Sequence, residues 1–267
     1  MRVCGLRLGA DSPDSQVTFR LLSNSAHVLF LILSLVFALL PSAPADGPPP
    51  TPVLVELFTS EGCSSCPPAD SLLRELEARQ PVPGVEVIPL GFHVDYWDDL
   101  GWKDRFSSPD YTRRQQEYRA RFGLDSVYTP QMVVDGRVQF VGNDSAAAFD
   151  AIRRAARDPK PAIGLRRTSD GKLQIDVGRS PRRADVLLVI TEGNLSTSVG
   201  AGENRGRSLR HTGVVRSLTR IGSTNDGRFQ ASVPLPSPSA GQELRAVVFL
   251  QRGIAGEVMA AASMPLR

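Results

Sequence analysis

Two cysteines three positions apart, Cys63 and Cys66 in the stretch "TSEGCSSCPPAD", are the residues of this chain best suited to chemistry. This spacing lets the thiols close a disulfide across the first turn of a helix. Pro67 and Pro68 suit that turn, because its first positions need no backbone donor. Unpaired N–H groups and the helix dipole would stabilise a thiolate on Cys63. We therefore expect Cys63 to be the nucleophile of a disulfide exchange and Cys66 to be the resolving thiol.

Other interpretations of the pair remain open. A structural disulfide closing about four residues contributes only roughly 2 kcal/mol, and a Cys-His hydrolase is a further, weaker alternative. A closed zinc site needs four ligands, for which only these two cysteines, His93 and His211 follow the N-terminal region. A copper-binding or copper-delivery site formed by Cys63, Cys66 and His93 is the main alternative, because thiolates are soft donors that suit Cu(I). The third alternative is a secreted binding module with a purely structural disulfide.

A second signal is a Thr-Pro pair in "VYTPQMVVDG" (127–136), far downstream of the cysteines. The succession of strand, CxxC, helix and later Thr-Pro resembles the thioredoxin superfamily. The resemblance implies that Pro130 is a cis-proline opposite the sulfurs and that Thr129 helps to hold an extended substrate segment. It also implies that Glu56 is a general base for the deeper cysteine, the alternative being an exposed carboxylate at the edge of the sheet.

Five segments narrow the resemblance to one family. They are "TSEGCSSCPPAD", "HVDYWDDLGW", "SPDYTRRQQEY", "VYTPQMVVDG" and "GENRGRSLRHTGVVR". Together they resemble secreted thioredoxin-like proteins catalogued as a domain of unknown function, which implies a fold but no activity. The motif departs from ordinary thioredoxins in having Gly62 before the first cysteine and Ser64-Ser65 within the pair. Glu61 would oppose thiolate formation if it faces the sulfur.

Two further segments carry unusual side chains. The stretch "FHVDYWDDLGW" (92–102) interleaves aromatic residues with acids, and Trp97 is a candidate wall of a substrate cleft. The alternative is that Trp97 and Trp102 only cover the end of a sheet. Residues 202–216 contain Arg205, Arg207 and Arg210. For this segment we favour a contact between the two halves of the chain over an anion site or an exposed loop.

The expected elements differ between the halves. The first half alternates strand patterns (53–58, 84–94 and a hairpin at 131–142) with helix patterns that start at Pro67, Pro109 and Asn143. From Ala162 onward, strand-like runs are separated by Gly, Asp-Gly and Pro. These patterns predict an α/β thioredoxin-like domain over 53–158, with a mixed sheet flanked by helices, followed by an all-β sandwich-like domain over 162–267.

The N-terminus has the features of an export signal. An uncharged apolar run covers residues 28–40, which is short of the ~20 residues that a membrane span needs. Arginines precede the run, and Ala43 and Ala45 follow it in the arrangement of a signal-peptidase site. We predict a signal peptide over 1–45, a Pro-rich tether over 46–52, no stable membrane span after cleavage and an extracytoplasmic location, periplasmic or secreted. Disulfides persist in such compartments.

Composition restricts the partners. The chain carries 31 basic and 28 acidic residues, a net charge of +3 that does not indicate nucleic-acid binding. We expect the partners to be protein thiols or disulfides and a further redox protein, with no cofactor.

Overall fold

The computed structural model describes residues 48–224 and 227–266, and the predicted signal peptide lies outside them. Pro49–Arg267 forms one compact unit. The predicted tether ends inside the first strand, which begins at Thr51. No helix in the described ranges is long and apolar enough to cross a membrane.

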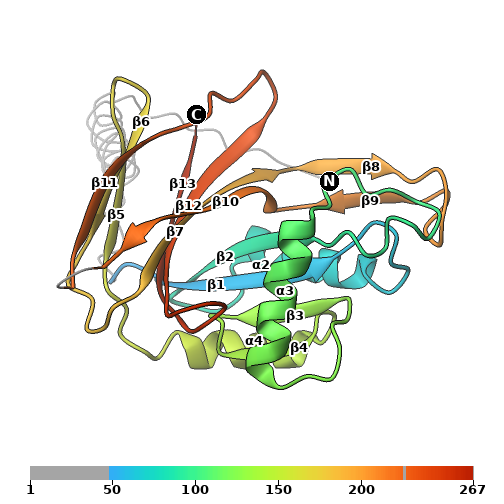
Figure 1. Ribbon diagram of the computed structural model, residues 1–267, viewed down its shortest axis with the longest axis horizontal. Coiled ribbons are helices and arrows are strands. Elements are labelled where there is room, and N and C mark those ends of the chain that lie inside the picture. Colours follow the sequence, from blue (N-terminus) through green and yellow to red (C-terminus); the bar gives the residue numbers. More distant parts are fainter. Residues whose placement is uncertain (1–47, 225–226, 267) are drawn as a thin grey trace, which may run out of the picture. The chain divides into compact units, whose positions relative to one another are not determined.

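The described residues form three helices and thirteen strands (Figure 1). The helices are α2 (Pro67–Arg79), α3 (Pro109–Phe122) and α4 (Ser145–Ala155). The strands are β1 (Thr51–Thr59), β2 (Val85–His93), β3 (Gln131–Val134), β4 (Val138–Val141), β5 (Ile163–Arg167), β6 (Lys172–Val177), β7 (Asp185–Gly193), β8 (Leu195–Ser198), β9 (Ser208–His211), β10 (Val214–Ser223), β11 (Phe229–Pro234), β12 (Glu243–Gln251) and β13 (Val258–Pro265).

Local sequence signals explain the bounds of the helices. The side chain of Ser108 accepts a hydrogen bond from Asp110 N at the start of α3, and Gly123 ends this helix with a left-handed φ of 65°. Asp144 caps α4 through Ala147 N. The expected starts of the first two helices, at Pro67 and Pro109, are confirmed.

The predicted fold class, a helix-flanked thioredoxin-like domain followed by an all-β sandwich, is wrong. One mixed sheet of eight strands, in the order β13-β12-β7-β10-β2-β1-β3-β4, takes strands from both halves of the chain. The halves join where β10 runs parallel to β2, with Val214 opposite Gly91, and Gly91 N donates to Gly213 O (2.8 Å). A Cβ atom at Gly213, whose φ is +57°, would lie 2.6 Å from Pro89 O. This close backbone approach depends on glycine, and hydrophobic periodicity does not reveal it.

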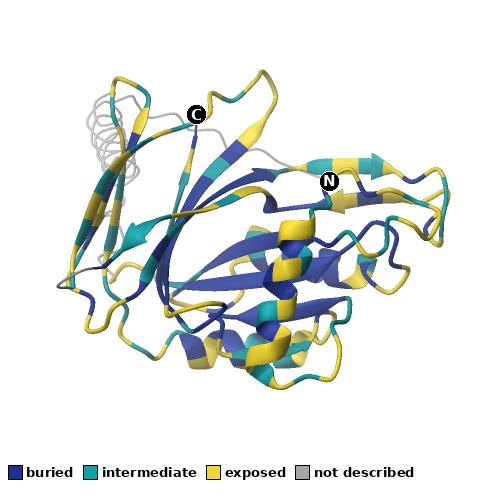
Figure 2. Cartoon of the chain, in the orientation of Figure 1, coloured by how far each residue is buried: buried dark blue, intermediate teal, exposed yellow. Residues whose placement is uncertain are grey.

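The two faces of β1 enter different cores. Val53, Val55 and Leu57 pack with α2 and α4. Leu54 and Phe58 pack with α3 and also with residues of β7, β10, β12 and β13. A third core lies between the eight-stranded sheet and the three-stranded sheet β11-β6-β5. The central strands are accordingly buried, whereas β5, β6 and β11 carry exposed residues (Figure 2). The second half therefore packs two sheets face to face, but it shares one of them with the first half.

Strands β8 and β9 form a separate two-stranded hairpin. They lie side by side at one end of the molecule in Figure 1. The residues between them, 199–207, contact the loop that carries the cysteines.

Candidate functional site at the Cys63–Cys66 disulfide

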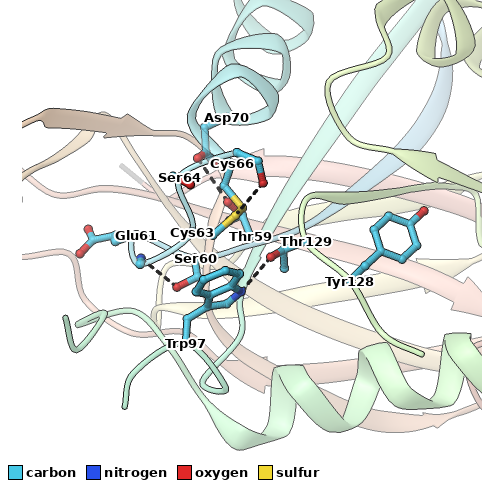
Figure 3. Close-up of a disulfide and its surroundings, with 12 residues drawn as sticks. Thr59, Ser60, Glu61, Cys63, Ser64, Cys66, Asp70, Trp97, Tyr128 and Thr129 are labelled. Carbon is cyan, nitrogen blue, oxygen red and sulfur yellow. Dashed lines mark hydrogen bonds between the residues drawn. A yellow bond between two sulfur atoms is a disulfide. The ribbon is translucent and has the colours of Figure 1, made fainter. Parts of the chain in front are cut away.

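Cys63 and Cys66 form a disulfide at the start of α2, with their Cα atoms 5.4 Å apart. Cys66 is the N-cap residue, and prolines occupy the first two helical positions. Neither cysteine has exposed surface. Ser64 and Ser65 between them are exposed. The predicted disulfide is confirmed (Figure 3), and both cysteines are buried.

Several backbone donors near the pair are already engaged. Cys66 O accepts hydrogen bonds from the amides of Ala69 and Asp70 (2.9 and 3.1 Å). Ser64 N donates to Glu203 Oε2 (3.1 Å), and the two prolines that begin the helix have no N–H. The unpaired amides expected to stabilise a thiolate are therefore not present at these positions, which leaves the helix dipole as the favourable field.

The predicted substrate-binding residues meet beside the cysteine loop. The Thr129–Pro130 peptide bond is cis, as the resemblance implies. Trp97 Nε1 donates to Thr129 Oγ1 (2.8 Å), and a Cβ atom at Gly62 would lie only 3.2 Å from Trp97 Cβ. Trp97 thus spans from the CxxC loop to the Thr-Pro loop (Figure 3). Thioredoxins usually have a tryptophan where this chain has Gly62. The absence of a side chain at Gly62 leaves room for Trp97.

Pro130 is buried next to the first turn of α2. A Cβ atom at Gly142 would lie 3.1 Å from Pro130 Cβ and 3.2 Å from Ala69 Cβ. Gly142 therefore lies between Pro130 and Ala69, a residue of the first turn of α2.

The β8–β9 hairpin reaches across to the cysteine loop. Asn204 is fully buried, and its Nδ2 donates to both Glu61 O and Cys63 O (2.9 Å each). Arg207 NH1 donates to Asn204 Oδ1 (2.8 Å), which fixes the orientation of the amide. The favoured contact between the halves through residues 202–216 is present. Asn204 and Glu203 make it directly, and Arg207 supports it.

Sequence reasoning missed a buried charged group beside the disulfide, the Glu61–His211–Asp70 triad. The His211 ring lies between two carboxylates, with Nε2 3.4 Å from Glu61 Oε1 and Nδ1 3.7 Å from Asp70 Oδ1. Trp102 Nε1 donates to Glu61 Oε2 (2.9 Å), and Thr59 Oγ1 donates to Asp70 Oδ2 (3.2 Å). The three side chains come from the loop after β1, from β9 and from α2.

The triad is charged at neutral pH. Burial, the largest single effect, opposes the ionisation of Glu61, but interactions with His211, Thr197 and Trp102 together outweigh it, and the pKa of this carboxyl falls below its ordinary value. Burial lowers the pKa of His211, while Asp70 and Glu61 raise it to about 9. The pKa of His211 rises through electrostatic attraction to these carboxylates at ion-pair distance, because neither of its ring nitrogens forms a well-oriented hydrogen bond. His211 is therefore protonated at neutral pH.

His93 lies next to the triad but does not face the cysteines as a ligand. Its Nδ1 lies 2.6 Å from Asp104 Oδ2, which also accepts a hydrogen bond from Glu61 N (2.8 Å). The His93 and His211 rings pack edge to face, 4.8 Å between centroids. Within the described ranges no three His, Cys, Asp or Glu side chains are grouped to hold a metal ion. The structure therefore does not assemble the Cys63, Cys66 and His93 set of the copper alternative.

Glu56 lies away from the disulfide. It is fully buried, and its carboxylate binds Arg114 Nε (2.6 Å) and Tyr118 OH (2.5 Å) of α3. Gln251 of β12 donates to the same Tyr118 hydroxyl (3.0 Å). Because α2 covers the opposite face of β1, the structure does not bring Glu56 to the cysteines. The alternative of an exposed carboxylate is wrong as well.

Comparisons with known proteins agree with this architecture. Residues 54–251 match the model of a family described as "Protein of unknown function (DUF1223)". A crystal structure of a protein from Agrobacterium tumefaciens shares 25% identity and a TM-score of 0.67, covering 83% of this chain and 97% of that chain. HBP35 of Porphyromonas gingivalis shares 16% identity and a TM-score of 0.57, covering 82% of this chain and 76% of that chain, which shows likeness of fold alone. The comparison with curated proteins finds no match to this chain.

Proposed function

Because this chain belongs to the DUF1223 family, whose description assigns no activity, we propose from its site that it exchanges disulfides with protein thiols through Cys63 and Cys66. A partner thiolate attacks the sulfur of Cys63, the S–S bond breaks, and Cys66 leaves as a thiolate that takes up a proton. The resulting mixed disulfide on Cys63 is resolved either by Cys66 or by a second thiol of the partner. In the reverse direction the same steps oxidise the pair.

One observation carries this proposal. The disulfide at the start of α2 lies beside Trp97 and Thr129 and next to the buried ionisable side chains Glu61 and His211. Buried groups with shifted pKa values concentrate at functional sites. A disulfide that served only as a staple would gain nothing from a buried ion cluster, since desolvation of the charges is costly.

The thioredoxin-superfamily resemblance enters the proposal only through this local unit, the CxxC motif at a helix start together with Thr129-Pro130. The predicted fold class is not part of it. We also propose that the protein acts outside the cytoplasm, because the N-terminal segment has the pattern of an export signal and disulfides persist in exported proteins.

The surroundings of the pair favour a weak oxidant. A strongly oxidising pair needs its reduced form to be stabilised. Here the Ser64 amide is bonded to Glu203, and Glu61 carries a negative charge two residues before Cys63, which disfavours a thiolate. We therefore expect a reduction potential nearer to roughly −270 mV than to −120 mV.

The test measures this potential and the mixed disulfide. Residues 46–267 would be equilibrated with dithiothreitol buffers and followed by tryptophan fluorescence, because both tryptophans of the chain contact the cysteine loop. In parallel, Cys66→Ser should retain partner proteins covalently and Cys63→Ser should not. A potential below about −300 mV, with no trapped partner, would identify a structural disulfide and end the proposal.

A further inference from the structure

The Glu61–His211–Asp70 triad has an unusual state of hydrogen bonding. Glu61 Oε1 and both ring nitrogens of His211 are buried without a hydrogen-bond partner. Buried polar atoms in native proteins are nearly always bonded, so each exception calls for an explanation such as a catalytic role or a bound water. The His211 side chain is 1% exposed and the Glu61 side chain 0%. The His211 ring and Glu61 Oε1 are therefore buried together at ion-pair distance.

The triad is attached to the disulfide at both ends. Asp70 lies one helical turn after Cys66 on α2, which places the two on the same side of the helix, and its amide donates to Cys66 O. Glu61 lies two residues before Cys63, and Asn204 binds the carbonyl oxygens of both. Figure 3 shows Asp70 above the cysteine pair and Glu61 to its left.

In the described part of the chain, His211 is the only cation paired with the two carboxylates. Among the described residues, neither Glu61 nor Asp70 forms an ion pair with Lys or Arg, and each pairs only with His211. The further ionisable groups at the ring are His93, in edge-to-face contact with it, and Asp104 behind His93. A proton on His211 therefore sets the net charge of the triad.

We propose that the triad stores the proton that Cys66 takes up when the disulfide opens, with Asp70 passing the proton and His211 holding it. This inference rests on the proposed exchange activity. When a thiolate attacks Cys63, the electron pair of the S–S bond moves to Cys66, and a proton from His211 Nδ1 reaches Cys66 through the Asp70 carboxylate. His211 then becomes neutral and regains a proton from solvent.

The same path runs in reverse during resolution. His211 first releases its proton to solvent. As Cys66 attacks the sulfur of Cys63, the bond from Cys63 to the partner breaks, the partner leaves as a thiolate, and the proton of Cys66 passes to Asp70 and on to His211. His211 acts through Asp70 and is thus a positioning residue, while Glu61 fixes the ring through Nε2. His211 carries its proton at neutral pH, because Asp70 and Glu61 raise its pKa to about 9 against the opposing effect of burial.

The experiment follows the attack of Cys66 on a mixed disulfide between Cys63 and glutathione. This step is intramolecular, so the pKa of an added thiol does not affect its rate. Reduced protein would be mixed with saturating oxidised glutathione, and the release of the second glutathione would be timed between pH 6 and 10. The wild-type rate should rise through an inflection near pH 9, when His211 loses its proton and can take up the one that Cys66 releases. His211→Gln should lose the inflection near pH 9 and keep only the rise that comes from ionisation of the Cys66 thiol. Asp70→Asn should slow the step about 100-fold at pH 7.

The control is Asp185→Asn, which removes a carboxylate from an ion pair with Arg220 at the other end of β7. It should keep the wild-type profile. If His211→Gln keeps the inflection, the triad is only structural and the inference is overturned.

A second measurement needs no variant. NMR titration of the His211 ring in the oxidised protein should give a midpoint near 9, and a midpoint near the ordinary 6.5 would also overturn the inference, because the store would be empty at neutral pH. Absence of the exchange activity itself would be detected in a different experiment, in which the Cys66→Ser variant traps no partner protein on Cys63.

Discussion

Replacement of Asn204 by alanine should open the way to the buried disulfide. Cys63 has no exposed surface, so a partner can reach it only after local opening, and Asn204 ties the β8–β9 hairpin to the backbone of the cysteine loop. Two hydrogen bonds are lost in Asn204→Ala. Each contributes about 0.5–1.5 kcal/mol net, so the free energy of local opening should fall by about 1–3 kcal/mol.

The expected change in rate follows from that free energy. If opening is fast compared with attack, the rate of reduction scales with the opening equilibrium constant, and 1.4 kcal/mol corresponds to a factor of ten. Reduction of Asn204→Ala by dithiothreitol at fixed pH should therefore be roughly 5 to 150 times faster than that of the wild type. Tryptophan fluorescence gives the time course.

Gln230→Ala is the matched control, because it removes an amide that binds Asp176 in the three-stranded sheet, far along the chain from the cysteines. Its reduction rate should stay within about twofold of the wild type, since surface substitutions change stability by only about 0.5 kcal/mol. Reduction in low urea separates local opening from global unfolding, because local opening exposes little surface and depends weakly on urea. An Asn204→Ala variant that unfolds more easily, yet is reduced at the wild-type rate, would refute the gating role of the hairpin.

Three further predictions concern stability. Glu56→Gln should lower the free energy of unfolding in urea by about 3–5 kcal/mol, because it leaves Arg114 charged and buried. The pH dependence of disulfide exchange should stay unchanged in this variant. An altered pH dependence would contradict the placement of Glu56 away from the disulfide. The folded-state pKa of His211 is raised to about 9 from about 6.5 in the unfolded chain. Its stabilising effect is therefore complete below pH ~6.5 and is lost as pH rises through 9, on the order of 3 kcal/mol, and His211→Gln should flatten the unfolding free energy over that window. Gly213→Ala should lower Tm, with about 1–3 kcal/mol lost to overpacking where the halves join, whereas Gly164→Ala, with its nearest neighbour at 3.7 Å, should be tolerated.

The sequence predicts the local parts of the site well, because their signals are local. The cysteine spacing and the prolines after it place a disulfide at a helix start, and Ser108 and Gly123 mark the ends of α3. The contact partners of the disulfide could not be predicted in the same way. Asn204 lies 141 residues after Cys63, and no periodicity links the two.

Glu56 shows a different limit of sequence reasoning. Strand alternation correctly groups Glu56 with Leu54 and Phe58 on one face of β1. Alternation does not tell which face the cysteine-bearing helix will cover. The structure places α2 on the side of Val53, Val55 and Leu57, so a correct assignment of faces still led to the wrong neighbour for the carboxylate.

The shared sheet gives the second half of the chain a part in the candidate site. Glu203, Asn204 and His211 all come from the β8–β9 hairpin, and the hairpin leads directly into β10, the strand that joins the two halves. An isolated first half would lose the cation of the triad and leave Glu61 and Asp70 without their only ion-pair partner among the described residues. Two carboxylates left unpaired beside the cysteines would disfavour a thiolate. In the proposed exchange reaction, the β-rich half therefore contributes to the reactivity of the disulfide and does not only cover it.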